Sequence, residues 1–125
     1  MRLKDLGKPI IITENGLADA RDDRRSLFLR RYLYAVSKAI HDGADVRGFF
    51  YWSLIDNFEW NLGFGMKFGL FSVDRQTMTR RLRDGSKYFQ FVVRSFRGLP
   101  VDPSVVGRPP KVLKSYEPIT ERKRK

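Results

Sequence analysis

The chain has 125 residues, enough for one domain or for a piece of a larger one, and its 42% hydrophobic content suits a packed core. It contains no cysteine and only one histidine, which excludes a disulfide framework, thiolate metal sites and metal centres built on imidazole clusters. The net charge of +11 can indicate binding to nucleic acid or anionic surfaces, but the positive residues are spread along the chain, with one compact run only at residues 122–125. We therefore expect a solvated basic surface, and a basic nucleic-acid binder is the alternative.

The first predicted element is a strand over residues 9–13, where three consecutive isoleucines follow a proline. Such a run of β-branched residues is typical of a strand that is buried on both faces in a parallel sheet. Glu14 stands directly after this strand, and an Asn-Gly turn signal follows at residues 15–16. Because ligands and chemistry gather at the carboxyl ends of parallel strands, Glu14 is a candidate catalytic carboxylate. The alternatives are a solvated glutamate entering a turn, or a hairpin closed by Asn-Gly.

A charged loop then leads to a helix that is predicted to begin within residues 23–26 and to end at Gly43. Its apolar positions form one stripe at helical period: Leu29, Tyr32, Leu33, Val36 and Ile40. His41 lies in the last turn. Because that end of a helix lies opposite the carboxyl ends of the strands, we do not expect His41 to be a site residue.

The remaining elements follow in chain order. Residues 48–53 form a second apolar run, which predicts a strand parallel to the first. Residues 54–69 are aromatic without a clean period and predict a long, ordered loop. Residues 70–74 predict a short strand that forms one arm of a hairpin. A last helix is predicted over residues 85–97 from one apolar stripe: Phe89, Val92, Val93 and Phe96.

Aromatic and acidic side chains follow the second predicted strand. Trp52, Glu59 and Trp60 lie within nine residues of one another. Sugars have apolar ring faces and a rim of hydroxyls, so a pyranose site combines aromatic platforms with carboxylates or amides. The alternative is that the tryptophans belong to the core and Glu59 is exposed. The spacing alone leaves both interpretations open.

Two longer motifs carry a family resemblance. Residues 12–16 (ITENG) and residues 51–60 (YWSLIDNFEW), followed by KFG at residues 67–69, resemble the C-terminal end of family-1 glycoside hydrolases. These are retaining β-glucosidases and β-galactosidases on a (β/α)8 TIM barrel. The similarity covers about residues 8–98 and implies an α/β fold made of the last two strand–helix units of such a barrel.

The resemblance also implies roles for individual residues. Glu14 matches the catalytic nucleophile at the end of the seventh barrel strand. Trp52 matches the tryptophan on which the glycone ring stacks, and Glu59 the carboxylate that binds the glycone's outer hydroxyls. Trp60 matches an indole donor beside it, and Phe68 an aromatic side chain that lines the same subsite. The implied reaction is a double displacement with retention, and no cofactor or metal is implied.

The chain departs from the family pattern in several respects. Lys67 stands where arginine is usual, and Phe64 where tyrosine is usual. The family's acid/base comes from an Asn-Glu-Pro motif near the fourth strand, which these residues do not contain. The resemblance therefore implies that the isolated chain is inactive or nearly so. It implies as partners a β-glycoside substrate and a complementary N-terminal barrel fragment, or self-association through open strand edges. The alternative is a non-catalytic carbohydrate-binding or scaffold remnant.

The domain boundaries and location follow from the same reading. Residues 1–100 are expected to form the C-terminal part of the barrel, and residues 101–125 a flexible, Pro-rich basic tail. No apolar run reaches about 18 residues, so no membrane span is expected. No signal-peptide pattern follows the first methionine, which makes a cytoplasmic location the default expectation.

Overall fold

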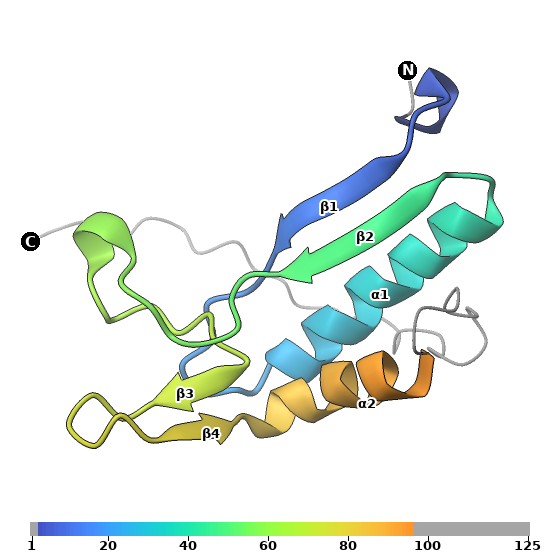
Figure 1. The fold of residues 1–125 in the computed structure, drawn as a ribbon. Coiled ribbons are helices and arrows are strands. Elements are labelled where there is room, and N and C mark those ends of the chain that lie inside the picture. Colours follow the sequence, from blue (N-terminus) through green and yellow to red (C-terminus); the bar gives the residue numbers. More distant parts are fainter. Residues whose placement is uncertain (1–2, 97–125) are drawn as a thin grey trace, which may run out of the picture.

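The computed structural model describes residues 3–96, which fold into strands and helices in α/β order (Figure 1). The helices and strands are β1 (Ile10–Asn15), α1 (Arg25–His41), β2 (Val46–Tyr51), β3 (Phe71–Val73), β4 (Arg80–Leu82) and α2 (Lys87–Phe96). Short 3-10 helices lie at Leu3–Leu6, Trp60–Leu62 and Asp84–Ser86. The predicted tail over residues 101–125 and the last residue of the final predicted helix lie outside the described part of the chain.

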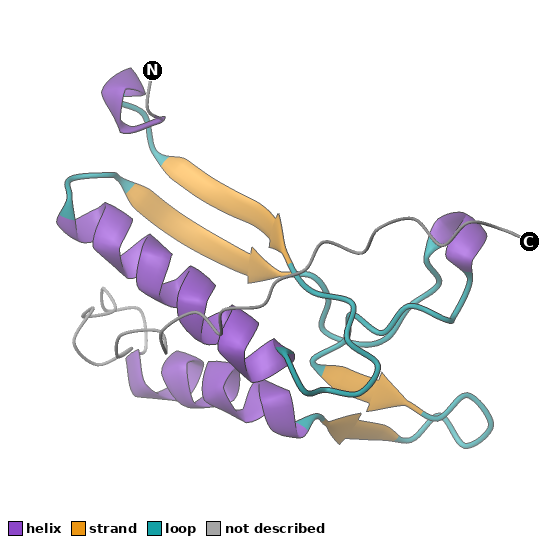
Figure 2. Cartoon of the chain, turned by 180° about the vertical axis from the view of Figure 1, so that it is seen from behind, coloured by secondary structure: helices purple, strands orange, loops and turns teal. Residues whose placement is uncertain are grey.

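β1 and β2 form a parallel pair that is joined by α1, as the predicted strand–helix–strand order requires. Asn15 at the end of β1 lies opposite Tyr51 at the end of β2. α1 runs alongside the two strands, and α2 lies beside α1 (Figures 1 and 2). β2 begins earlier than the predicted run at residues 48–53, because Val46 already pairs with Ile10 of β1. It also ends earlier, because Ser53 N hydrogen-bonds to Phe68 O rather than to β1.

The expectation that β1 is buried on both faces is wrong for the described residues. Ile10 and Ile12 line the space between the strands and α1, but the alternate residue Ile11 is 56% exposed. Phe50 of β2 is likewise 61% exposed. Among residues 3–96, helices cover only one face of the two-stranded sheet, so the other face stays open.

A small apolar core joins α1, α2 and β2. Leu33 of α1 and Val92 of α2 are buried, and half-buried aromatic rings pack around them: Tyr34, Phe49, Tyr88 and Phe89. The two helical stripes are therefore confirmed at their centres. Tyr32 and Val93, which belong to the same predicted stripes, are 45% and 58% exposed, so each stripe is narrower than its period suggests.

The strand expected at residues 70–74 is confirmed as β3, which pairs antiparallel with β4 in a hairpin. The sequence does not predict β4, because consecutive arginines at 80 and 81 show no strand pattern. Within the described residues, neither α1 nor α2 combines the length and the apolar character of a helix that crosses a bilayer.

Candidate functional site

The carboxyl ends of β1 and β2 meet at one edge of the sheet. Trp52 N donates to Asn15 O across 3.0 Å, which continues the pairing one residue past β2. Gly16 packs directly on this point, since a Cβ added to it would overlap the Trp52 carbonyl oxygen. A glycine is therefore required here for the two backbones to approach. The sequence places Glu14 and Trp52 beside this junction, on the two neighbouring strand ends.

Glu14 is the penultimate residue of β1, and its side chain is exposed. Within residues 3–96 its carboxylate makes no hydrogen bond or ion pair, so both oxygens remain available to a ligand. The alternative of a hairpin closed at residues 15–16 is excluded, because the next strand in the sheet is parallel and follows a helix.

Trp52 and Glu59 are joined directly. Trp52 Nε1 donates to Glu59 Oε1 across 3.1 Å, which holds the carboxylate beside the indole. Trp52 is 38% exposed, so it is not a core residue. Glu59 itself is half-buried, because the loop folds back through hydrogen bonds from Glu59 N to Gly63 O and from Leu62 N to Glu59 O.

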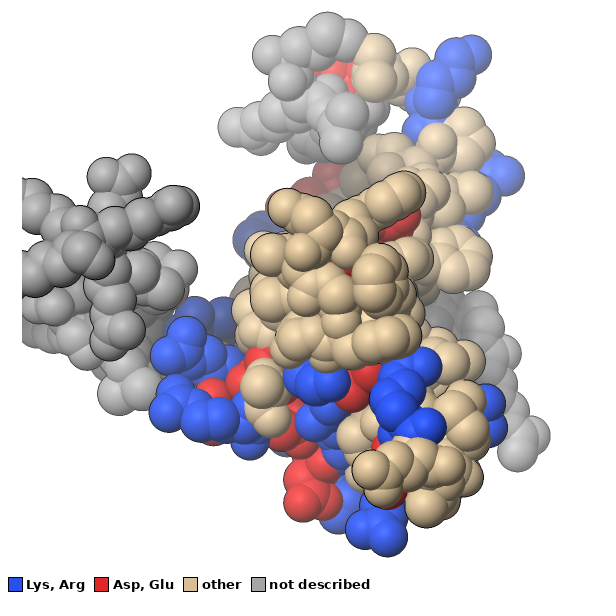
Figure 3. Space-filling model, turned by 90° about the vertical axis from the view of Figure 1, so that its left-hand side faces the viewer, with Lys and Arg blue, Asp and Glu red and all other residues tan. Residues whose placement is uncertain are grey.

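The loop between β2 and β3 carries an exposed apolar surface. Figure 3 shows uncharged side chains gathered over this loop, above a region where basic and acidic side chains are mixed. Trp60, at the tip, is 86% exposed, and the exposed apolar residues nearby are Leu54, Phe58, Leu62 and Phe64. The interpretation of Trp60 as a core residue is therefore wrong, and its ring is open to a ligand.

Phe68 is half-buried and lies on the returning arm of the same loop. Its carbonyl accepts hydrogen bonds from Ser53 N at 3.5 Å and from Arg25 Nη1 at 2.9 Å. Leu70 N donates to Ser53 O at 2.8 Å, so the returning arm runs beside the residue that follows Trp52. The structure therefore holds the backbone of Phe68 next to the carboxyl end of β2.

Asp56 and Arg25 are site-supporting residues that the sequence analysis does not single out. Asp56 is 3% exposed, accepts a hydrogen bond from Gly69 N and pairs with Arg83 at 2.7 Å. Arg25 is 0% exposed and bonds to carbonyls on both sides of the site. The sequence does contain a signal for the burial of Arg25. This charged residue stands four residues before Leu29, so it lies on the apolar stripe of α1.

The two family departures lie next to each other. Lys67 Nζ donates to the carbonyl of Phe64 at 2.6 Å, and the guanidinium of Arg75 stacks over the Phe64 ring at 4.1 Å. Arg75 also donates to Asp56 O. These contacts hold the outer loop and leave the residues at the strand ends untouched.

Burial and hydrogen bonding shift the pKa of two groups near the site. Burial of Asp19 opposes ionisation, but hydrogen bonds from the N–H groups of Arg24 and Arg25 and the Arg25 charge outweigh it, so the pKa of Asp19 falls below 3.8. Burial raises the pKa of Tyr51 above 10.0, although the nearby Arg25 charge opposes this shift. Among the described residues, no group of three or more His, Cys, Asp or Glu is placed to hold a metal ion.

The arrangement combines an open carboxylate, a partly exposed indole with an attached carboxylate, and further exposed aromatic rings. Such a set can bind the apolar face and the hydroxyls of a pyranose, and it can present a nucleophile to it. Glu14 lies in the last two residues of β1, and the other groups follow the carboxyl end of β2 in the chain. No hydrogen bond within residues 3–96 joins Glu14 to Glu59.

Comparison with known proteins shows which family model and which relatives this chain resembles. The model of a family described as "Glycosyl hydrolase family 1" matches residues 2–97. A β-galactosidase of Sulfolobus acidocaldarius is 39% identical over 106 residues, which cover 85% of this chain and 21% of that protein. A β-galactosidase of Pyrococcus woesei is 45% identical over 80 residues, 64% of this chain and 16% of that protein.

Solved structures that resemble this chain carry similar names. The β-glycosidase from Pyrococcus horikoshii is 42% identical with a TM-score of 0.72, covering 85% of this chain and 24% of that one. The β-glucosidase from Pyrococcus furiosus is 43% identical with a TM-score of 0.71, covering 80% of this chain and 21% of that one. The chain thus spans only about a fifth of the length of the curated relatives it matches.

Proposed function

Since the chain belongs to glycosyl hydrolase family 1, we propose that it is part of a retaining β-glycosidase and supplies the nucleophile and half of the glycone site. The observation that carries this proposal is the junction of the two strand ends. There the exposed carboxylate of Glu14 and the Trp52 indole lie at the ends of neighbouring strands, and Glu59 is hydrogen-bonded to that indole. We further propose that the two strands belong to a (β/α)8 barrel, whose chemistry gathers at this edge.

In the proposed reaction, a Glu14 oxygen attacks the anomeric carbon of a terminal β-glucosyl or β-galactosyl residue. A carbon–oxygen bond forms as the glycosidic bond breaks, and a second carboxylic acid protonates the leaving oxygen. That acid, now ionised, takes a proton from water, which attacks the same carbon and releases Glu14. Two inversions give net retention, and the second carboxyl group must lie about 5 Å from the first.

The glycone contacts follow from side-chain chemistry. The Trp52 ring offers an apolar face for stacking, while Glu59, held by the Trp52 N–H, accepts hydrogen bonds from sugar hydroxyls. Trp60 adds an indole N–H donor. Phe68 adds an aromatic wall, and its backbone hydrogen bonds keep it close to β2.

The isolated chain is proposed to have little activity. Residues 1–125 contain no Asn-Glu-Pro motif, which carries the acid/base in the family. General acid–base catalysis contributes about 10²–10⁴-fold, so its loss together with half of the sugar site leaves little turnover.

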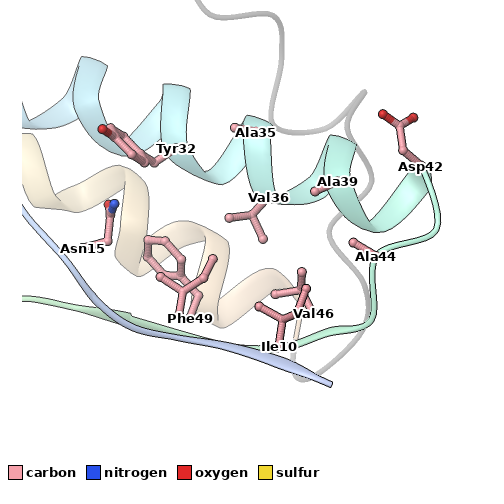
Figure 4. A pocket seen from close by; sticks show the side chains of 11 residues that line it. Ile10, Asn15, Tyr32, Ala35, Val36, Ala39, Asp42, Ala44, Val46 and Phe49 are labelled. Carbon is pink, nitrogen blue, oxygen red and sulfur yellow. The ribbon is translucent and has the colours of Figure 1, made fainter. Parts of the chain in front are cut away.

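The partner we propose is the remaining part of the barrel. A cavity of about 440 Å³ lies between α1 and the strands and is lined mostly by apolar side chains (Figure 4). Asn15 lies at one end of this lining, and its buried Oδ1 has no hydrogen-bond partner among the described residues. A neighbouring strand–helix unit has the apolar character to fill this space, and the relatives are long enough to include one.

The test is a graft, in which this chain replaces the segment that it matches in the Pyrococcus horikoshii β-glycosidase. We expect the graft to hydrolyse an aryl β-glucoside. Glu14→Gln should lower its kcat/KM by about a thousandfold or more, because the amide is no longer a nucleophile. Asp45→Asn, the same change at the far end of β2, is the matched control and should leave the rate unchanged. Hydrolysis that survives Glu14→Gln would rule out the proposed role.

A second candidate function is non-catalytic carbohydrate binding. It is favoured by the exposure of Trp52 and Trp60, at 38% and 86%. It predicts that sugars quench the tryptophan fluorescence of the 125-residue chain without being hydrolysed, and that Trp52→Ala abolishes this quenching. Quenching together with retained hydrolysis of the graft would favour the enzyme instead.

A further inference from the structure

Arg25 is a fully buried cation at the first residue of α1. It is 0% exposed and is the largest of the fully buried side chains. A cation is unfavourable at a helix N-terminus, and a buried guanidinium is costly unless its donors are satisfied. The surroundings of Arg25 must therefore compensate for both effects.

Every nitrogen of the guanidinium has an acceptor. Nε donates to Asp22 Oδ1 at 2.8 Å, which is an ion pair. The other acceptors are Leu17 O at 3.1 Å, Tyr51 Oη at 2.6 Å and Phe68 O at 2.9 Å for Nη1, and Asp19 O and Lys67 O, both at 2.9 Å, for Nη2. Four of these six acceptors are backbone carbonyls, so the guanidinium is bonded to the main chain of the loops and not only to side chains.

The acceptors belong to the three segments that carry the candidate site. Leu17 and Asp19 follow Glu14, Tyr51 directly precedes Trp52, and Phe68 is itself a predicted glycone contact. We propose that Arg25 is a positioning residue, whose guanidinium holds the segment after Glu14, the end of β2 and the segment of Phe68 in the arrangement that the sugar requires. This inference rests on the proposed function, because it names what orients that site.

Stabilisation of the helix start does not explain these contacts. The Asp19 carboxylate already accepts hydrogen bonds from the N–H groups of Asp22, Arg24 and Arg25 at 3.1, 2.9 and 3.0 Å, so the backbone that leads into α1 and the first N–H group of the helix have an acceptor without the guanidinium. The guanidinium instead reaches to the loops. Besides the guanidinium, a backbone hydrogen bond from Asp19 N to Lys67 O, at 3.0 Å, directly links the loop after β1 with the loop between β2 and β3.

Lysine cannot replace this arrangement. A guanidinium presents five donors in a rigid, planar fork, whereas an ammonium presents three donors from one atom. Arg25→Lys therefore keeps the charge next to Asp22 but loses most of the simultaneous contacts to the loops. The site segments are then free to shift, and a misplacement of about 1 Å can cost about 10²-fold in rate.

The experiment compares variants of the graft by kinetics and by amide hydrogen exchange. Arg25→Lys should lower kcat/KM by about tenfold or more. Tyr51→Phe removes one acceptor and is milder, with an expected loss of about threefold. Leu33→Ala in the core of α1 is the stability-matched control. It should lower the melting temperature comparably while kcat/KM stays within about twofold.

Hydrogen exchange decides the positioning role even without activity. In Arg25→Lys we expect faster exchange at the amides of Asp19 and Ser53, which bond to Lys67 O and Phe68 O, with unchanged exchange in β1 and β2. Unchanged exchange at these amides, or a kcat/KM equal to that of Leu33→Ala, would overturn the inference. An unsubstituted graft that fails to hydrolyse would instead overturn the proposed function, while the exchange result would still test Arg25.

Discussion

At the scale of single residues, the loop that carries the proposed sugar contacts is held by a buried ion pair. Asp56 and Arg83 lie 2.7 Å apart, with side chains 4% and 12% exposed. Removing one member of such a pair leaves the other charge buried and uncompensated, which costs about 3–5 kcal/mol. The same carboxylate also accepts a hydrogen bond from Gly69 N, so the loop's return is anchored by one residue.

We therefore expect Asp56→Ala to lower the free energy of unfolding by about 3 kcal/mol, as measured by urea denaturation. Asp45→Ala breaks an exposed ion pair with Arg47 and serves as the control, with no expected change. Equal effects of the two substitutions would contradict the anchoring role of Asp56.

A second residue-scale prediction concerns pH. The pKa of Asp19 is lower in the folded chain than its ordinary value of 3.8. Ionised Asp19 therefore stabilises the fold above pH 3.8, and this contribution is lost as the pH falls through the lower folded-state pKa. Asp19→Asn should destabilise the chain at about pH 6, and this effect should shrink as the pH falls below 3.8. Asp23→Asn, an exposed carboxylate in the same loop, is the control. A stability difference that is constant with pH would refute the assignment.

At the scale of elements, α1 is held by two deeply buried leucines. Leu29 is 0% exposed, and Leu33 is 5% exposed. Leu29→Ala should cost about 2–5 kcal/mol of unfolding free energy, because the cavity it leaves cannot collapse fully. Ala35→Ser, on an exposed part of the same helix, is the control and should change stability little. Chemical denaturation measures both, and similar small losses would contradict the packing described for α1.

The elements also show what a sequence can and cannot predict. The parallel pair follows from a β-branched run and an aromatic run, and both helices follow from apolar stripes at helical period; all of these are local signals. The open face of β1 does not follow, because a run of isoleucines looks the same whether one or both faces are covered. The sequence does not predict β4, because its arginines pair with β3 through backbone hydrogen bonds and show no apolar alternation.

In the candidate site too, some residues can be predicted from local sequence signals and others cannot. Glu14 and Trp52 can be recognised because each lies at or directly after the end of a predicted strand, and because each belongs to a motif of the family. Arg25 and Asp56 act through contacts that span 43 and 27 residues of sequence, to Phe68 and to Arg83 respectively. No local pattern encodes such partners, so the supporting residues emerge only from the fold.

At the scale of the whole molecule, the open face of the sheet is the main unsatisfied feature of the described residues. Ile11 and Phe50 are exposed on it, and the apolar cavity beside α1 adds a further surface. If the rest of a barrel covers these surfaces, a Pyrococcus horikoshii β-glycosidase that lacks the matched segment should bind this chain as a separate polypeptide.

A charge on this face should prevent that association. We expect Ile11→Lys to weaken binding by about tenfold or more, because an unpaired cation would be buried at the interface. Thr79→Lys places the same charge on the hairpin turn and should leave binding unchanged. Calorimetry of the two chains measures both, and self-association of this chain in place of binding would show that a second copy covers the face.

The most direct test of the account is to identify the atom that bonds to the sugar. The graft is incubated with an activated β-glucoside whose 2-hydroxyl is replaced by fluorine, which slows release of the covalent intermediate, and is then digested and analysed by mass spectrometry. We expect the peptide that contains Glu14 to gain the mass of one fluoroglucosyl group, and Glu14→Gln to abolish this gain. A graft that hydrolyses β-glucosides but carries the label on another residue would contradict this expectation.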